Sequence, residues 1–213
     1  YMPDYKLVNA EHSLKKAAVQ IKAASEKLSY TGMFILLFFI FMRSTIHTGL
    51  STYLPLFFMK FRGSEAIFAC AFVSAFLLGG VAGTYTGAVL SDRLGARRII
   101  LGSIILSIPT IWLISHAGTE IGAMLAVVAS GFFIIGSFAT TIVLAQTMLP
   151  DNVGMAAGLT IGFSVGMGGF GVTILGFIAD NFGLPLVMQI VTWLPVAAAI
   201  IALKIPIPAS LRK

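Results

Sequence analysis

Long apolar stretches, separated by short polar segments, dominate this chain of 213 residues. Apart from Arg43 in the first of them, the stretches contain no Asp, Glu, Lys or Arg. Each reaches the ~20 residues that a helix needs to cross a hydrocarbon core of about 30 Å. Strand alternation is absent, and lipid requires backbone polar groups to be satisfied within a segment, so the pattern predicts an all-α membrane protein with six transmembrane helices. The stretches are 30–59, 66–91, 99–119, 121–150, 152–179 and 181–203.

The composition excludes other classes of protein. Hydrophobic residues make up 58% of the chain and charged residues 10%, against about 25% charged residues in a globular domain. The mean hydropathy of +0.97 likewise excludes a soluble globular domain and a disordered chain. Cys70 is the single cysteine, so neither an intramolecular disulfide framework nor a Cys-rich metal site is possible. We expect no metal and no cofactor.

Basic residues are unevenly distributed between the two sets of connections. The chain has 14 Lys and Arg against 8 Asp and Glu. Lys60 and Arg62 lie in one set, Arg43 lies inside a span, and the rest lie in the set that contains both termini. Because cytoplasmic connections are rich in Lys and Arg, both termini are predicted to be cytoplasmic, in a multi-pass inner-membrane protein. The excess of basic over acidic residues is therefore interpreted as a signal of membrane topology, with nucleic-acid binding as the weaker alternative.

Residues 1–29 differ from the rest because they are rich in polar side chains. Ser13 can cap a helix whose apolar stripe includes Leu14, Ile21 and Leu28. Two interpretations remain open, a basic amphipathic helix on the cytoplasmic face of the membrane and a solvated linker. The predicted organisation is a cytoplasmic amphipathic linker over 1–29, a six-helix bundle over 30–204 and a cytoplasmic tail over 205–213.

The chain contains an internal repeat. A shift of 88 residues places glycines and aspartates of the second and fifth spans on one another. Because each copy contains three helices, the second copy enters the membrane from the opposite side, which predicts a 3+3 inverted repeat typical of secondary transporters. The matched pairs are Gly80 with Gly168, Gly83 with Gly171, Asp92 with Asp180 and Gly95 with Gly183.

Small residues recur every four positions on the same two spans. Such a face lets another backbone approach closely in lipid. The faces serve either packing within the six-helix unit or the docking of another bundle that slides against them. We assign them as helix-packing interfaces: Gly79, Gly83 and Gly87 on one span, and Gly154, Gly158, Gly162 and Gly166 on the other.

The turn after the second span carries a family resemblance. Residues 87–98 read Gly-Ala-Val-Leu-Ser-Asp-Arg-Leu-Gly-Ala-Arg-Arg. They resemble the Gly-x-Leu-Ala-Asp-Arg-x-Gly-Arg-Arg signature of the major facilitator superfamily (MFS), with Ala88, Ser91 and Ala96 as departures. The resemblance implies that this chain is the C-terminal half of a fold built from two six-helix halves. It also implies a cytoplasmic gate motif formed by Asp92, Arg93, Gly95, Arg97 and Arg98.

Two further stretches, 43–56 and 143–169, resemble the fosmidomycin-resistance-type efflux proteins. This implies a transporter rather than an enzyme: a proton-coupled antiporter that exports small molecules and confers antibiotic resistance. The expected partners are the lipid bilayer, the small-molecule substrate, protons, and either a missing N-terminal half or a second copy. The alternatives are a non-transporting scaffold or gene fragment, and an MFS importer of a sugar or organic acid.

Three polar side chains inside the spans are substrate or coupling candidates. Arg43 lies near mid-membrane, where a charge costs roughly 2.5–3.5 kcal/mol on insertion scales, so it either binds a polar or anionic substrate group or has a structural role. His47, at i+4 on the same helix face, is either a proton-exchanging group or a neutral hydrogen-bonded one. Gln146 is the third deep polar group.

No catalytic residue is expected. Residues 162–166 read Gly-Phe-Ser-Val-Gly, which matches a serine-nucleophile pattern, but that pattern needs a strand-to-helix turn. An intramembrane serine protease is the enzyme alternative, and it would need a histidine facing Ser164.

Overall fold

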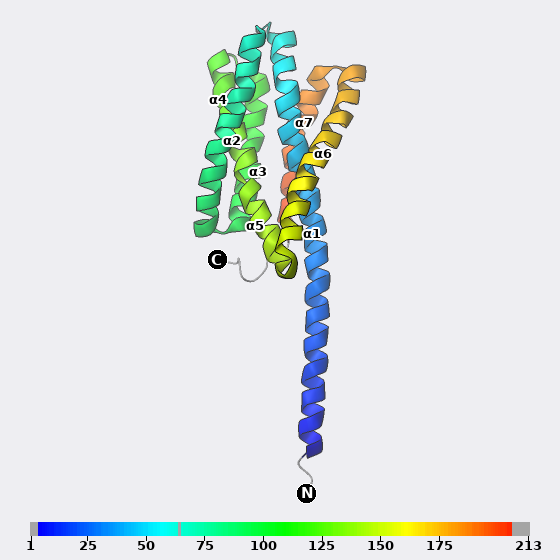
Figure 1. Ribbon diagram of the computed structural model, residues 1–213. Coiled ribbons are helices and arrows are strands. Elements are labelled where there is room, and N and C mark those ends of the chain that lie inside the picture. Colours follow the sequence, from blue (N-terminus) through cyan, green and yellow to red (C-terminus); the bar gives the residue numbers. More distant parts are fainter. Residues whose placement is uncertain (1–3, 64, 206–213) are drawn as a thin grey trace.

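The computed structural model describes residues 4–63 and 65–205, with only the backbone described for 4–29 and Arg62. The described part consists of helices joined by short connections (Figure 1). They are α1 (Asp4–Arg62), α2 (Ala66–Leu94), α3 (Ala96–His116), α4 (Glu120–Gly136), α5 (Phe138–Met148), the 3₁₀ turn η1 (Pro150–Asn152), α6 (Val153–Phe182) and α7 (Leu184–Leu203).

The structure confirms the predicted spans. Six segments of the described chain are long and apolar enough to cross a membrane. The fourth differs from a single helix, because α4 ends at Gly136 and α5 begins at Phe138, with Ser137 between them. The segments are Tyr30–Phe61, Ala66–Leu94, Ala96–His116, Glu120–Met148, Pro150–Phe182 and Leu184–Leu203.

The first span continues directly from the N-terminal segment. Helix α1 runs without interruption from Asp4 to Arg62, and its first part extends beyond the bundle (Figure 1). The predicted segment 1–29 is therefore helical from Asp4 onward. Its amphipathic contact with the membrane surface stays a prediction, because its side chains are outside the described part. The predicted tail lies outside it too, except for Ile205.

The inverted repeat is visible in two equivalent turns. Helix α2 ends at Gly95 (φ +88°, ψ 146°) and helix α6 ends at Gly183 (φ +88°, ψ 161°). Each glycine N–H donates to the carbonyl oxygen four residues earlier, Ser91 at 2.9 Å and Ala179 at 2.9 Å. This backbone region is accessible essentially only to glycine. The two turns lie at opposite ends of the bundle, as an inverted repeat requires (Figure 1).

The two repeats are interlocked through their second helices. Helix α2 packs on α4, which opens the second repeat, and α6 packs on α1, which opens the first. A Cβ added at Gly83 would lie 2.1 Å from the carbonyl oxygen of Phe132, and one added at Gly171 would lie 2.2 Å from Oγ1 of Thr45. In lipid, such close approach is a main source of helix association.

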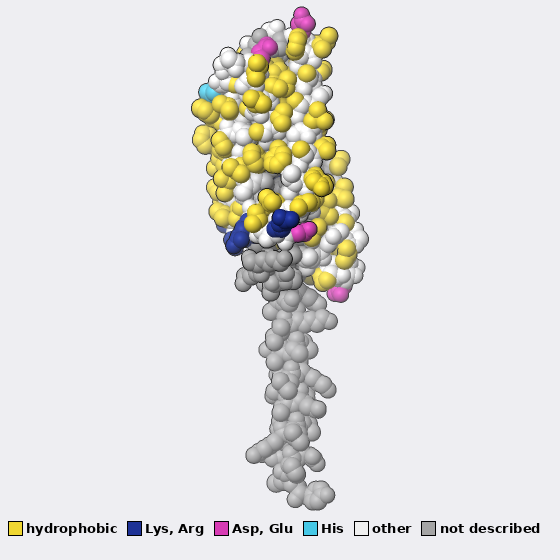
Figure 2. All heavy atoms as spheres, turned by 90° about the vertical axis from the view of Figure 1, so that its left-hand side faces the viewer, with side chains coloured by type: hydrophobic (Ala, Val, Ile, Leu, Met, Phe, Trp, Pro, Cys, Tyr) yellow, Lys and Arg dark blue, Asp and Glu magenta, His cyan; other side chains and the backbone are white. Residues whose placement is uncertain are grey.

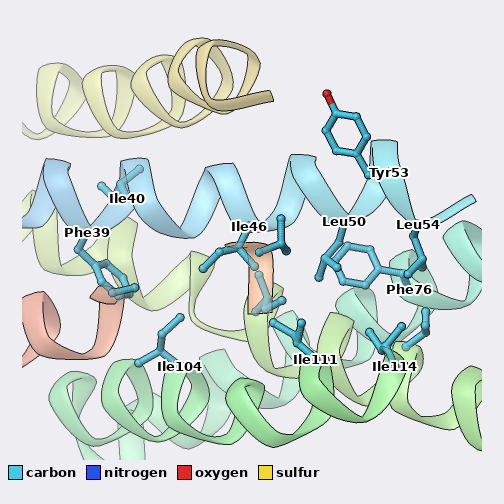
Figure 3. Packing of buried hydrophobic residues seen from close by; sticks show 14 of the residues in the cluster. Phe39, Ile40, Ile46, Leu50, Tyr53, Leu54, Phe76, Ile104, Ile111 and Ile114 are labelled. Carbon is cyan, nitrogen blue, oxygen red and sulfur yellow. The ribbon is translucent and has the colours of Figure 1, made fainter. Parts of the chain in front are cut away.

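Helix α1 supplies much of the apolar core. Phe39, Ile46 and Leu50 are fully buried. Figure 3 shows Phe39 and Ile46 on the side of α1 that faces Ile104 and Ile111 of α3. One edge of α1 thus packs into the bundle, and Arg43 lies on the same edge, four residues after Phe39 and three before Ile46.

Candidate substrate and coupling site

Arg43 lies at the junction of the two repeats. Its side chain is 3% exposed. From α1 it donates hydrogen bonds to the carbonyl oxygen of Ile134 (3.4 Å) and to Oγ of Ser164 (3.4 Å). Its guanidinium carbon lies 5.0 Å from the ring centroid of Phe138, a cation–π distance. One buried cation therefore contacts α4, α5 and α6.

The break in the fourth span explains why a guanidinium is stabilised there. The last carbonyls of a helix have no intrahelical partner and carry the negative end of the helix dipole. Ile134 is in the last turn of α4, which ends at Gly136. Arg43 thus donates to the negative end of a helix that stops inside the membrane. Every Asp and Glu between residues 30 and 205 lies within three residues of a helix end or in a connection, so no carboxylate of this segment lies at that depth.

A pair of serines, Ser44 and Ser164, joins α1 and α6. Ser44 Oγ donates to the carbonyl oxygen of Ser164, and the two hydroxyl oxygens are 3.3 Å apart. A Cβ added at Gly168 would lie 2.7 Å from both Oγ of Ser44 and Oγ1 of Thr48. The absence of a side chain at Gly168 lets these hydroxyls sit against the backbone of α6. Small and hydroxyl residues therefore set the distance between α1 and α6.

Two buried polar atoms, one on Arg43 and one on α5 two residues after Phe138, have no partner within the described part. The Nε of Arg43 and Oγ1 of Thr140 are buried and have no hydrogen-bond partner within the described part. Most buried polar atoms in native structures are paired, so each such atom needs an explanation. A guanidinium donor and a hydroxyl that are both free are suited to an oxygen-bearing ligand.

His47 and Gln146, the other two predicted site residues, lie at different distances along the chain from Arg43 and its contacts. His47 is half-buried one turn after Arg43, and its ring centroid lies 5.6 Å from that of Phe76. Gln146 is half-buried on α5, eight residues after Phe138, or about 12 Å along the helix. The structure brings together Arg43 and the serine pair, whereas Gln146 is not among the contacts of Arg43.

The predicted gate residues lie at the turn between α2 and α3. Asp92, Arg93, Arg97 and Arg98 are exposed there, and Gly95 has the positive φ described above. Arg97 Nη2 donates to the carbonyl oxygen of Leu203 at 3.2 Å, which ties the start of α3 to the end of α7. The residues therefore share one end of the bundle, and their role in gating stays a prediction.

The two glycine faces have different surroundings. A Cβ added at Gly79 or Gly87 would lie 2.2 or 2.1 Å from a carbonyl oxygen of α4, as at Gly83. That face is occupied within the chain, so packing within the unit accounts for it. On the predicted glycine face of α6, added Cβ atoms would meet no described atom within 4 Å, and the four glycines are exposed. These are Gly154, Gly158, Gly162 and Gly166.

Sequence reasoning missed the partners of Arg43. Ser164 was considered only as part of a nucleophile pattern, yet within the described residues its hydroxyl contacts Arg43 and Ser44 rather than a histidine. Phe138 and Ile134 have apolar side chains, so the sequence does not indicate that they contact a charged group. The available signal was Ser164 itself, a hydroxyl in a span otherwise rich in glycine and apolar residues.

Comparison with known proteins decides the family. A family model described as transmembrane secretion effector, of the MFS type, matches residues 5–212. The chain belongs to this family of MFS transporters. It is 32% identical over 190 residues to the fosmidomycin resistance protein of Escherichia coli (strain K12), covering 88% of this chain and 47% of that protein. This MFS protein is thus a multi-pass membrane protein, and its resemblance to the fosmidomycin-resistance type is confirmed.

Two further similarities agree with this MFS assignment. The chain is 37% identical over 146 residues to YfnC, an uncharacterised MFS-type transporter of Bacillus subtilis (strain 168), covering 68% of this chain and 35% of that protein. The crystal structure of the MFS transporter FucP in the outward conformation matches with a TM-score of 0.62 at 17% identity, over 81% of this chain and 43% of that one. The second likeness shows the fold alone. The chain spans about half the length of the curated relatives that it matches.

Proposed function

We propose that this chain forms one half of a proton-coupled MFS exporter of small, anionic or strongly polar molecules. The observation that carries the proposal is Arg43, buried between the two inverted repeats with an unpartnered Nε. In transporters built from inverted repeats, substrate sites lie near the midplane between repeats, often beside broken helices. Arg43 lies beside such a break and binds an oxyanion of the substrate through its free donor.

The resemblance to fosmidomycin-resistance proteins supports this substrate class. A guanidinium matches the geometry of phosphonate, phosphate and carboxylate oxygens, which it can bind through two parallel hydrogen bonds. Thr140, on α5 two residues after Phe138, supplies a further hydroxyl that has no partner within the described part. His47, one helical turn from Arg43, is the group in this chain that exchanges the coupling proton, because the spans contain no acidic residue at mid-depth.

The transport cycle requires a second six-helix bundle. The exposed glycines of α6, from Gly154 to Gly166, form a face on which no described residue packs within 4 Å of an added Cβ. The relatives are about twice as long as this chain, which supports an N-terminal six-helix half as the partner on this face. Alternating access then consists of rocking of the two bundles, with the turn at Asp92 holding one access state.

The proposed location is the inner membrane with both termini in the cytoplasm. The exposed Arg93, Arg97 and Arg98 lie at one end of the bundle, and Lys60 is exposed in the last turn of α1 at the other end (Figure 1). The excess of basic residues marks the cytoplasmic side.

The test is export by cells that produce the transporter with Arg43→Gln, Arg43→Lys or the native residue. We expect Gln to abolish the resistance to fosmidomycin or a related phosphonate, and Lys to retain part of it because it keeps the positive charge. Lys60→Gln, which removes an exposed cation in the last turn of α1, is the matched control. Full export by Arg43→Gln at normal membrane abundance would overturn the proposal.

A non-transporting scaffold is the second candidate, and the length relative to known transporters favours testing it directly. The 213-residue chain is reconstituted alone into vesicles, and uptake of a labelled phosphonate is followed under an imposed pH gradient. Flux supports a homodimeric transporter. Absence of uptake by the chain alone, together with uptake once a six-helix partner is added, supports one half of an exporter.

A further inference from the structure

An apolar groove runs along the outer side of α2, α3 and α4. Its volume is about 270 Å³. Phe132 and Phe133 of α4 contribute to its lining, together with Leu90 of α2 and Leu106 of α3, and Arg98 lies at the end of the α2–α3 turn. Figure 2 shows this side of the molecule, where hydrophobic side chains cover the spans and Lys and Arg gather at the lower end. The groove thus combines a hydrocarbon-like lining with one cationic residue.

At the cationic end of the groove, basic side chains outnumber acidic ones. Helix α3 begins there, and its N-cap, Gly95, provides no side-chain hydrogen bond. Its first turn contains no acidic residue, but it does contain Arg97 and Arg98, which lie at the positive end of the helix dipole. Arg97 is directed to the carbonyl oxygen of Leu203. The turn contains one carboxylate, Asp92, and three guanidinium groups, those of Arg93, Arg97 and Arg98.

We propose that an anionic phospholipid occupies this groove, with an acyl chain against Phe132 and Phe133 and its phosphate at Arg98 and the first turn of α3. Two observations favour a lipid over a free anion. The groove lining is almost wholly apolar, which suits a hydrocarbon chain and not a hydrated ion. Helix α2 ends at Leu94 and α3 starts at Ala96, so the basic turn lies where a span ends and headgroups lie.

Photolabelling in membranes of cells that produce the protein tests this site. The probe is phosphatidylglycerol with a diazirine on its acyl chain, and phosphatidylcholine with the same label is the zwitterionic comparison. Labelled peptides are mapped by mass spectrometry. We expect labelling of 99–106 and 132–136 by the anionic probe, in excess over the zwitterionic one and displaced by unlabelled phosphatidylglycerol.

Substitutions separate the two parts of the site. Arg98→Gln is expected to lower labelling by phosphatidylglycerol about fivefold and to leave labelling by phosphatidylcholine unchanged. Arg93→Gln is the matched control, because Arg93 has the same charge in the same turn but does not line the groove. Gly102 lines the groove, and a Cβ added there meets nothing within 4 Å. Gly102→Leu is therefore expected to fill the groove without disturbing the fold and to reduce labelling by both lipids, with Gly102→Ala intermediate.

Three results would each overturn the proposal. Equal labelling by the two lipids would show ordinary contact with the bilayer. Equal losses with Arg93→Gln and Arg98→Gln would show diffuse attraction to the basic turn. Absence of label from the groove in the native protein would show that another bundle, and not lipid, covers it.

Discussion

Nη2 of Arg43 lies 3.4 Å from Oγ of Ser164, so a charged side chain of the first repeat is held by the second helix of the other repeat. The two residues are 121 positions apart in the chain. The same guanidinium contacts the carbonyl end of α4 and the ring of Phe138. A shift of either repeat relative to the other would alter these contacts, so the proposed export should be sensitive to this pair.

Replacing Ser164 with Ala tests this contact. A hydrogen bond between membrane helices contributes about 0.6 kcal/mol on average, so we expect little loss of stability but a clear loss of export, because Arg43 is no longer held in place. Thermal stability in mild detergent and export are measured on the same preparation. Ser74→Ala is the matched control, because the Ser74 hydroxyl bonds within its own exposed helix turn. Export at the native level would show that Ser164 does not position Arg43.

Replacing Gly83 with Ala tests the packing of α2 on α4. The added Cβ would lie 2.1 Å from the carbonyl oxygen of Phe132, so the helices must separate. We expect destabilisation of about 1–3 kcal/mol, measured as a lower unfolding midpoint in detergent. Gly169→Ala is the control, because a Cβ there meets nothing within 4 Å. Equal midpoints for the two variants would contradict the close contact.

The glycine face of α6 predicts a different behaviour. Gly158→Trp adds a large ring at a position where, among residues 30–205, no atom lies within 4 Å of an added Cβ. We expect the bundle to stay folded but to lose both export and co-purification with its six-helix partner. Ile105→Trp, an exposed position on α3, is the matched control and is expected to retain both. If Gly158→Trp exports normally, the docking partner does not use this face.

The repeated turns predict matched losses of stability. Gly95→Ala and Gly183→Ala each force a side chain into a backbone region with φ of +88°, at a cost of about 1–3 kcal/mol. Gly118→Ala, in a connection without positive φ and with open space around it, is expected to be neutral. Unfolding in detergent measures all three. A neutral Gly183→Ala beside a damaging Gly95→Ala would show that the two turns are not equivalent.

The sequence by itself determined the spans and their repeat. A stretch long enough to cross lipid must be helical and nearly free of charge, so run length located the six spans. The recurrence of Asp92 and Gly95 at Asp180 and Gly183 exposed the inverted repeat, because a glycine-only turn leaves a local signature. Arg43 stood out for the same kind of reason: a charge at mid-membrane is costly wherever it points.

Only the tertiary structure decided what those residues meet. The faces at Gly83 and Gly158 are alike in sequence, yet one is packed on α4 and the other is open. The partners of Arg43 come from a helix break at Ser137, which has no distinctive local pattern, and from Ser164, whose local pattern does not indicate which residue it contacts. Helix formation depends on local composition, whereas the choice of partner depends on how distant segments fit together in three dimensions, and no single stretch of sequence contains that information.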